Sequence, residues 1–368
     1  MIETIRAFHE RAGTYTTEVA SNISRLLDPS VPLIRFAHTP DFLPYTGVLS
    51  NLVLCDAISS ASLSQGVPVM LVVDADTVED SRMRRALLPR SVANLSINVP
   101  KRLRQRVVGV LPPPSAREAR DVLYWLNSMA GVSCTSQGIN KLAKHIAHAL
   151  ANARNFGEFS SIIWSRLINL DAKLGTVFVS QIATAPSFFF AWSHLSGYSN
   201  RFFEANFLAC KSLEELGFEP DSQIFSRLRF WSVCLECGRR AINKKESIVP
   251  CKCGSSRTSM VPTLSSDVLS DWTVWGFSAG TSYLGSTAHV LVSLKIAECM
   301  GFDNWTEILW SGNSVARGEV LDGLERSDVE QGRVSIVADL CCESMQQWAI
   351  AWRRHLLTEG LNVMRGHS

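Results

Sequence analysis

The stretch "VPLIRFAHTPDFLPYTGVLSN", residues 31–51, decides how the first part of the chain folds. It begins with a mostly apolar run, Val31 to Ala37, which predicts a β-strand. A histidine and two prolines follow, and proline is poorly accommodated inside a helix. A helical pattern then begins at Gly47. A histidine, a proline and a glycine therefore stand where a buried strand ends, and the role of these three residues is the first question that the sequence poses.

The residues after this stretch predict a parallel β-sheet. Gly47 to Gln65 carries apolar residues at helical spacing, and "VPVMLVVDADT" after it is continuously apolar up to its acidic end. A continuously apolar strand that follows a helix is typical of a parallel sheet covered on both faces. Asp74 and Asp76 stand where this second strand ends, and ligands of open α/β sheets bind at the carboxyl ends of strands. The pattern predicts a βαβ unit with a binding site at that edge.

The rest of the chain is expected to be mixed helix and strand. Residues 1–30 show apolar residues at helical spacing, and residues 100–230 are expected to be mainly helical, with Ser115 capping the helix after "LPPP". Residues 175–195 include a further candidate strand. Residues 328–359 predict a long amphipathic helix stopped by Gly360.

Two histidines, His145 and His148, have the i, i+3 spacing of neighbours on one helix. A metal site would need a third ligand, and none stands nearby in the sequence. The interpretation is a solvated helix face.

Composition limits the classes of function. The chain has 368 residues, of which 46% are hydrophobic and 19% charged, with a formal net charge of +2. This charge gives no general attraction to nucleic acid or to an anionic membrane, so an RNA contact would need a local basic patch. The N-terminal residues lack the order of a secretory signal, and no apolar run approaches the roughly 20 residues that span a bilayer. The expectation is a soluble, cytoplasmic protein without a membrane partner.

Four of the ten cysteines form a pattern of their own. Cys234 and Cys237 stand in a C-x2-C turn, and Cys251 and Cys253 in a C-x-C turn, with thirteen residues between the pairs and a glycine directly after each. Four thiolates on two tight turns suit a closed tetrahedral zinc site, which has a structural role because it leaves no position for water. The alternatives are two accidental pairs or a redox dithiol. The remaining cysteines lie in apolar segments, where they behave as small core residues.

The order of these elements resembles the class I aminoacyl-tRNA synthetases, and within that class the catalytic domain of the class I lysyl-tRNA synthetases. In that family the first strand leads to a Ser-Pro or Thr-Pro pair, matched here by Thr39 and Pro40, and then to an ATP-binding H-I-G-H element. Tyr45 stands at its first histidine and Gly47 at its glycine. The acidic and basic stretch "DADTVEDSRMRRALLP" and the later segment "SDWTVWGFSAGTSYLGSTAH" are also similar to family segments in the same order.

The first loop also resembles a second family, the cysteine-adding enzyme of bacillithiol synthesis. That enzyme is a relative of the class I synthetases, and it joins an amino acid to a small amine without tRNA. "AHTP" followed by "TGVL" is similar to its G-H-Q-P loop, so that His38 stands at the loop histidine. "SYLGSTAHVLVSLKIAECMG" is similar to its Y-V-G-G segment. This resemblance leaves the zinc ribbon unexplained.

Together these resemblances imply a Rossmann-like parallel sheet of the class I synthetase type, with a helical insertion and a zinc ribbon. The first part of the nucleotide-binding domain would span residues 1–228, the ribbon 229–260, and the second part 261–368. ATP and Mg²⁺ are expected as substrates and Zn²⁺ as a structural ion. The implied nucleotide-binding residues are Thr39, Pro40, Gly47, Gly285 and His289; Asp74 and Asp76 would bind the amino acid or magnesium; and His38, Tyr45 and Arg317 are the candidate catalytic side chains.

Alternatives remain for these residues. His38 can instead bond a loop carbonyl, Tyr45 can simply pack, and the two aspartates can act as helix caps. The family's K-M-S-K-S loop should fall near "LWSGNSVARGEV", where Arg317 is the only basic residue, and no counterpart of its anticodon-binding domain is expected.

The expected function is a ligase that activates an amino acid with ATP and transfers it to a small amine or carrier, with tRNA as a further candidate acceptor. A catalytically silent binding or regulatory module, or a transferase that uses aminoacyl-tRNA, is the alternative.

Overall fold

The structure is a computed structural model, which describes residues 2–26, 28, 33–44, 67–87, 94–128, 136–167, 175–178, 207–208, 211, 230–242, 250–255, 260–264, 281–285 and 307–310. Two predicted helices, at 47–65 and 328–359, lie outside these residues. So do four of the candidate site residues, which are Tyr45, Gly47, His289 and Arg317.

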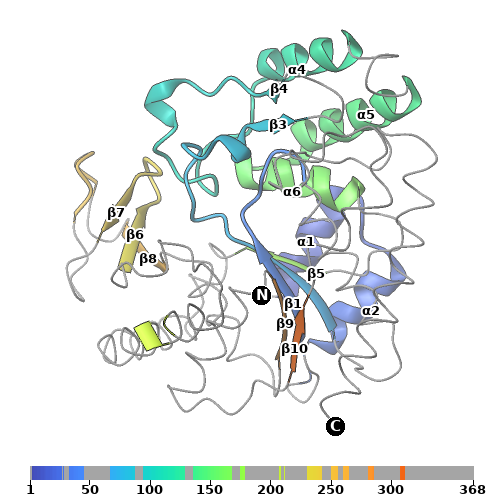
Figure 1. The fold of residues 1–368 in the computed structure, drawn as a ribbon, viewed down its shortest axis with the longest axis vertical. Coiled ribbons are helices and arrows are strands. Elements are labelled where there is room, and N and C mark those ends of the chain that lie inside the picture. Colours follow the sequence, from blue (N-terminus) through green and yellow to red (C-terminus); the bar gives the residue numbers. More distant parts are fainter. Residues whose placement is uncertain are drawn as a thin grey trace.

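Five parallel strands form the main sheet. They are β1 (Leu33–His38), β2 (Val67–Val72), β5 (Gly175–Phe178), β9 (Thr281–Gly285) and β10 (Glu307–Trp310), in the order β10-β9-β1-β2-β5 (Figure 1). From the central strand β1 the chain first moves outward through β2 to β5, and it later returns to the other side of β1 for β9 and β10. The connections from β1 and β9 thus run in opposite directions, which makes the carboxyl ends of these two strands a topological switch point.

Strand β2 shows why the sheet lies inside the molecule. All six of its residues are buried, so both faces of the strand are covered, as the unbroken apolar run required. The helices α1 (Ile2–Ala12) and α2 (Thr17–Arg25) contribute to this cover, since α1 packs against β5 and α2 against β2 and β5. The core of the described protein therefore forms between these helices and the sheet.

The continuous helix expected over the first thirty residues is interrupted. Helix α1 ends at Ala12. Gly13 follows it with a φ of +68°, a conformation that favours glycine, and the Thr14 N–H donates to the His9 carbonyl in a helix-ending turn. Thr16 then caps α2, with its side chain accepting from the Val19 N–H. The apolar residues keep their helical spacing on both sides of this break, so the spacing predicted one continuous helix. Gly13, Thr14 and Thr16 specify the break.

Three helices form a group above the sheet in the view of Figure 1: α4 (Ala116–Ser128), α5 (Ser136–Asn152) and α6 (Phe156–Leu167). The predicted Ser115 cap is confirmed: the Glu118 N–H donates to Ser115 Oγ, and the Ser115 N–H donates to the Glu118 carboxylate. Two short strands, β3 (Arg85–Leu87) and β4 (Asn94–Ser96), pair antiparallel, and the 3-10 turns η1 (Ser81–Met83) and η2 (Lys101–Leu103) flank them.

The interpretation of His145 and His148 as a solvated face is wrong. His145 is 8% exposed, and its Nδ1 accepts a hydrogen bond from Arg166 Nε of α6 at 3.1 Å. His148 Nε2 lies 2.9 Å from the Arg11 carbonyl oxygen of α1. Both histidines join α5 to neighbouring helices, because the helix is packed on a side that the local pattern did not identify as buried.

A second, antiparallel sheet of three strands lies beside the main sheet (Figure 1). Its order is β7-β6-β8, with β6 at Phe230–Cys234, β7 at Arg240–Ile242 and β8 at Met260–Leu264. Of the first cysteine pair, Cys234 ends β6 and Cys237 lies in the turn between β6 and β7. Among the helices that the structure describes, none combines the length and apolar character needed to cross a bilayer.

Candidate functional site

The turn after β1 is closed by its own hydrogen bonds. The Asp41 N–H donates across Pro40 to the Thr39 carbonyl at 2.9 Å, and Thr39 Oγ1 donates to Asp41 Oδ1 at 3.1 Å. Proline suits the middle of such a three-residue turn because its ring fixes φ and it has no N–H to satisfy. The Val73 N–H donates to the His38 carbonyl, which joins the turn to the residue after β2. The histidine and proline of the opening stretch thus form a defined turn at the carboxyl edge of the sheet.

His38 is fixed on this turn through one ring nitrogen. Its Nδ1 lies 2.8 Å from the Thr39 carbonyl oxygen and 3.3 Å from Thr39 Oγ1. The loop-carbonyl contact, one of the two roles that the sequence left open for His38, is therefore present. The His38 ring also lies beside Trp164 of α6, with 6.0 Å between ring centroids, and Trp164 Nε1 donates to the Asp41 carbonyl at 2.8 Å. Helix α6 thus holds the turn from the other side.

Asp41 is the buried acid of the site, and sequence reasoning missed it. The residue is 2% exposed, and within the described residues its Oδ2 has no hydrogen-bond partner. Burial raises the pKa of Asp41 to about 7, and the nearby charge of Arg82 only partly opposes this effect. The letters "TPD" predict a turn but give no sign of burial. The acid is identified only once α6 is seen to cover the turn.

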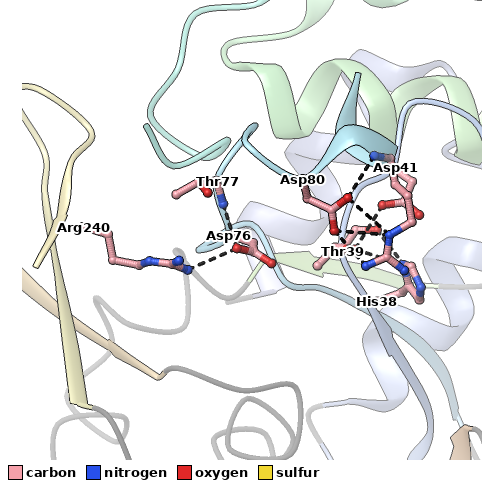
Figure 2. Close-up of polar contacts among 8 residues, drawn as sticks. His38, Thr39, Asp41, Asp76, Thr77, Asp80 and Arg240 are labelled. Carbon is pink, nitrogen blue, oxygen red and sulfur yellow. Dashed lines mark hydrogen bonds and ion pairs between the residues drawn. The ribbon is translucent and has the colours of Figure 1, made fainter. Parts of the chain in front are cut away.

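A second acid, Asp80, is held beside the turn by Arg82. The guanidinium of Arg82 pairs with the Asp80 carboxylate, with Nη2 2.8 Å from Oδ2. The Phe42 N–H donates to the Arg82 carbonyl at 3.0 Å, which joins Arg82 to the turn. Burial alone would raise the pKa of Asp80, but the hydrogen bonds and charge of Arg82 outweigh burial and lower it. Figure 2 shows His38, Thr39 and Asp41 gathered beside Asp80. The site therefore contains one acid that readily ionises and another that resists ionisation.

The two aspartates after β2 have different surroundings. Asp74 is fully buried, and a Cβ added at Gly109 would lie 2.6 Å from its Oδ2, so that only glycine admits the carboxylate there. Asp76 is partly exposed. Its Oδ1 accepts from the Thr77 N–H at 2.8 Å and pairs with Arg240 Nη1 at 3.1 Å (Figure 2). Of the two predicted substrate-binding carboxylates, Asp76 is the accessible one.

The four predicted metal ligands lie together. The sulfurs of Cys234, Cys237, Cys251 and Cys253 are all within 4.8 Å of one another, and two of the sulfur–sulfur distances are 3.7 and 3.4 Å. Four Zn–S bonds of about 2.3 Å in a tetrahedron place the sulfurs about 3.8 Å apart. The glycines after the two pairs have φ values of +68° and +86°, as the two-turn pattern predicted. The cluster is therefore compatible with a bound zinc ion.

The chemistry of the thiols also favours a cation between them. Burial and the hydrogen bonds of the three neighbouring thiols together raise the pKa of Cys237 to about 12. Without a positive charge at the centre, the cluster cannot hold four thiolates. Ser255 supports the ligands from outside, with its Oγ 3.0 Å from Cys234 Sγ and 2.9 Å from Cys253 Sγ.

The hairpin formed by β6, β7 and the turn between them, called the cysteine hairpin below, is attached to the loop that follows β2. The Val107 N–H donates to the Gly238 carbonyl at 2.8 Å, and Arg106 and Arg239 form an antiparallel bridge. The Val108 N–H in turn donates to the Asp76 carbonyl at 2.9 Å. Together with the pair between Arg240 and Asp76, these bonds hold the second sheet at the carboxyl edge of the first.

The sheet also brings two distant candidate residues to one edge. His38 ends β1 and Gly285 ends β9, and these strands are parallel neighbours. Thr39 and Pro40, both buried, follow directly after β1. Tyr45, Gly47, His289 and Arg317 belong to the part of the chain that the structure leaves undescribed.

A comparison with protein-family models finds no match for this chain, and a comparison with curated proteins finds no significant one. Inferences about function therefore rest on the geometry and on the sequence.

Proposed function

We propose that this chain is a Rossmann-like ligase of the class I synthetase type, which activates an amino acid with ATP and transfers it to a small amine or carrier. The observation that carries the proposal is the strand order. Segments almost 250 residues apart in the sequence, the His38 turn and Gly285, stand at the same edge of neighbouring parallel strands at a topological switch point. Nucleotide-binding sheets place their ligands at such a point.

The proposed reaction begins with attack of the amino-acid carboxylate on the α-phosphate of ATP. Enzymes accelerate such a step by positioning the reactants and by stabilising the developing charge. In this proposal Thr39, Pro40 and Gly285, together with Gly47 and His289, form the nucleotide site. Tyr45 and Arg317 donate to phosphate oxygens, and His38 is the third candidate catalytic side chain. ATP enters with Mg²⁺, which neutralises phosphate charge.

Asp76 has the best placement for the substrate ammonium group. Its carboxylate is partly exposed, whereas Asp74 is closed in by Gly109. Arg240 occupies one oxygen of Asp76 at 3.1 Å, so that the cysteine hairpin and the substrate group would share this carboxylate. In the same proposal the four cysteines hold a structural zinc ion, which keeps the hairpin in the conformation that presents Arg240.

The direct test is amino-acid-dependent exchange of labelled pyrophosphate into ATP. The expected result is exchange with one or a few amino acids, together with a rise in melting temperature on addition of Mg-ATP. Asp76→Asn should raise the amino-acid KM. The matched variant Arg240→Gln breaks the same ion pair but keeps the carboxylate, so it separates loss of the carboxylate from loss of the ion pair. If no proteinogenic amino acid supports exchange and ATP leaves the melting temperature unchanged, the ligase proposal is wrong. Unchanged melting behaviour would then favour the catalytically silent module.

A second candidate function is transfer from aminoacyl-tRNA, which needs no ATP. A local basic surface favours it. No aspartate or glutamate stands between Asp80 and Glu118. The pKa of Arg84 is lowered, mainly by burial and also by the neighbouring positive charges of Arg104 and Arg85. The bridge between Arg106 and Arg239 adds the basic side of the cysteine hairpin. The chain is nearly neutral as a whole, yet these segments are rich in guanidinium groups, which bind phosphate well.

RNA binding separates this candidate from the first. A surface of this kind predicts binding of labelled tRNA that weakens steeply with salt, and paired substitution of Arg104 and Arg106 by glutamine should reduce both the affinity and the salt slope. Arg6 and Arg11 on α1, which each pair with a glutamate, supply a matched control. Binding that is unaffected by the first pair of substitutions, or absent at low salt, contradicts an RNA role for this surface.

A further inference from the structure

The hydrogen bonds of the His38 turn have a fixed direction. Thr39 has one hydroxyl proton, which it gives to Asp41 Oδ1 at 3.1 Å. Its hydroxyl oxygen and its carbonyl oxygen, at 3.3 and 2.8 Å, are then both acceptors toward His38 Nδ1. A carbonyl oxygen cannot donate, so His38 Nδ1 must carry the proton. The turn thus defines a chain of donors from His38 through Thr39 to Asp41.

This direction determines the chemistry of the ring. A neutral imidazole has one N–H and one basic nitrogen, and when Nδ1 holds the proton, Nε2 holds the lone pair. Trp164 restricts rotation of the ring from the α6 side, while its own Nε1–H is used to hold Asp41 through the backbone. The ring therefore has a defined tautomer and a defined orientation, as a general base requires.

We propose that Thr39 and Asp41 are positioning residues, which hold His38 with Nε2 as the base that accepts a proton from the attacking amine. The inference rests on the proposed ligase function and names a residue for its second step. In that step the amine nitrogen forms a bond to the acyl carbon, the bond from this carbon to the adenylate oxygen breaks, and AMP leaves with the electron pair. The proton released by the amine nitrogen passes to His38 Nε2.

The charges around the turn fit this role. The buried Asp41 has a pKa raised to about 7, so a positive charge acquired by His38 favours the ionised form of Asp41 through Thr39. Asp80, which also interacts electrostatically with His38, is held by Arg82, and Asp76 is paired with Arg240. Asp41 is connected to the histidine by hydrogen bonds through Thr39.

The test reads the tautomer directly, by nitrogen NMR of protein labelled with ¹⁵N-histidine, with His38→Gln used to assign the signal. At a pH where the ring is neutral, the expected result is protonated Nδ1 and unprotonated Nε2. Protonation at Nε2 instead overturns the inference, whether or not the protein is active. Absence of pyrophosphate exchange overturns the proposed function alone, because the tautomer does not depend on it.

A second measurement separates positioning from simple stability. With the amino acid that supports exchange, and with methylamine as acceptor, Asp41→Asn and Thr39→Val should slow amide formation relative to exchange by about tenfold or more, which is part of the roughly 100- to 10,000-fold that general acid–base catalysis contributes. The pH profile of amide formation should shift in both variants, and Thr39→Ser should restore it because the hydroxyl returns. If both variants keep the wild-type pH profile and the wild-type ratio of amide formation to exchange, His38 does not depend on this chain of hydrogen bonds.

Discussion

The cysteine cluster and the His38 turn both lie beside the carboxyl edge of the main sheet, yet they are built in opposite ways. The cluster consists of four identical ligands on two short turns, and each turn is followed by a glycine with positive φ. The His38 turn consists of three different side chains, and its environment comes from Trp164, which is 123 residues from Asp41 in the sequence. The first arrangement is encoded locally, whereas the second depends on packing between distant segments.

This difference separates what spacing can predict from what it cannot. A C-x2-C turn constrains its two sulfurs within a few residues, so a ligand set can be recognised before the fold is known. The burial of Asp41 requires α6 to cover the turn, and no residue near Asp41 in the sequence indicates that α6 does so. Sites made of local turns should therefore lose their function when a ligand is removed, whereas sites made by packing should respond to changes far from the chemistry.

The largest expected effect comes from the metal ligands. Protein purified without chelator should contain about one equivalent of zinc, and Cys237→Ser should lose it together with the folded hairpin, since structural zinc contributes on the order of 10 kcal/mol to folding in small zinc domains. Elemental analysis and thermal unfolding check both results. Ser255→Ala is the matched variant, because it keeps four ligands and removes only the bonds to Cys234 and Cys253; the metal should bind about 10- to 100-fold more weakly. Less than about half an equivalent of zinc in the wild type would remove the metal site.

The next effect concerns the pH dependence of stability and arises from Asp41. Its pKa in the folded protein, about 7, is above the unfolded value of 3.8, so the folded state keeps a proton that the unfolded state loses. This group therefore makes stability fall as the pH rises from about 4 to about 7. His9, whose pKa burial lowers to about 4, has the opposite effect in nearly the same range.

Asp41→Asn isolates the contribution of this acid. The variant should lose the falling component and keep the rising component from His9, so that its stability increases from pH 4 to pH 7 more steeply than that of the wild type. Over that range the difference between the two proteins should change by on the order of a few kcal/mol. Urea unfolding at a series of pH values measures this difference. Parallel curves for wild type and variant would show that Asp41 is not buried in its acid form.

Local pattern predicted part of the structure well. Strand β1 lies within two residues of its predicted bounds, strand β2 begins at its predicted first residue, Ser115 caps its helix, and both cysteine turns have the expected glycine conformation. Each of these features is determined by neighbours in the sequence, through apolar runs, a capping residue or a tight turn.

The features that the sequence did not predict depend on tertiary contacts. His145 was interpreted as solvated, but α6 buries it, and the break at Gly13 was hidden by apolar residues that kept the same period on both sides. Asp74 was expected to face a ligand, yet the approach of Gly109 encloses it. Asp74 is enclosed and Asp76 stays accessible because of where Gly109 lies, and Gly109 comes more than thirty residues later in the sequence. The hydrophobic periodicity does not contain that information.

A third test compares two glycines that pack against Asp74. A Cβ at Gly109 would lie 2.6 Å from Asp74 Oδ2, whereas a Cβ at Gly157 would have its nearest neighbours at 3.4 Å, an ordinary contact. Gly109→Ala should destabilise the protein by about 1–3 kcal/mol through overpacking. Gly157→Ala lies in α6 and should be neutral or stabilising by up to about 1 kcal/mol, because alanine favours the helix. Chemical denaturation checks both, and equal effects would mean that Asp74 can move aside.

The smallest effect tests the contact that joins the two regions. Asp76 and Arg240 form a partly exposed ion pair at 3.1 Å, with side-chain exposures of 37% and 21%. Because solvent screens such pairs, a double-mutant cycle with Asp76→Asn and Arg240→Gln should give a coupling energy of about 0.5–1 kcal/mol, which decreases at high salt. The coupling should disappear in zinc-free protein, since the hairpin that carries Arg240 then loses its fixed conformation. A coupling that survives zinc removal unchanged would show that the hairpin is held by its backbone bonds to residues 106 and 107, and that the locally encoded cluster contributes nothing to the packed site beside it.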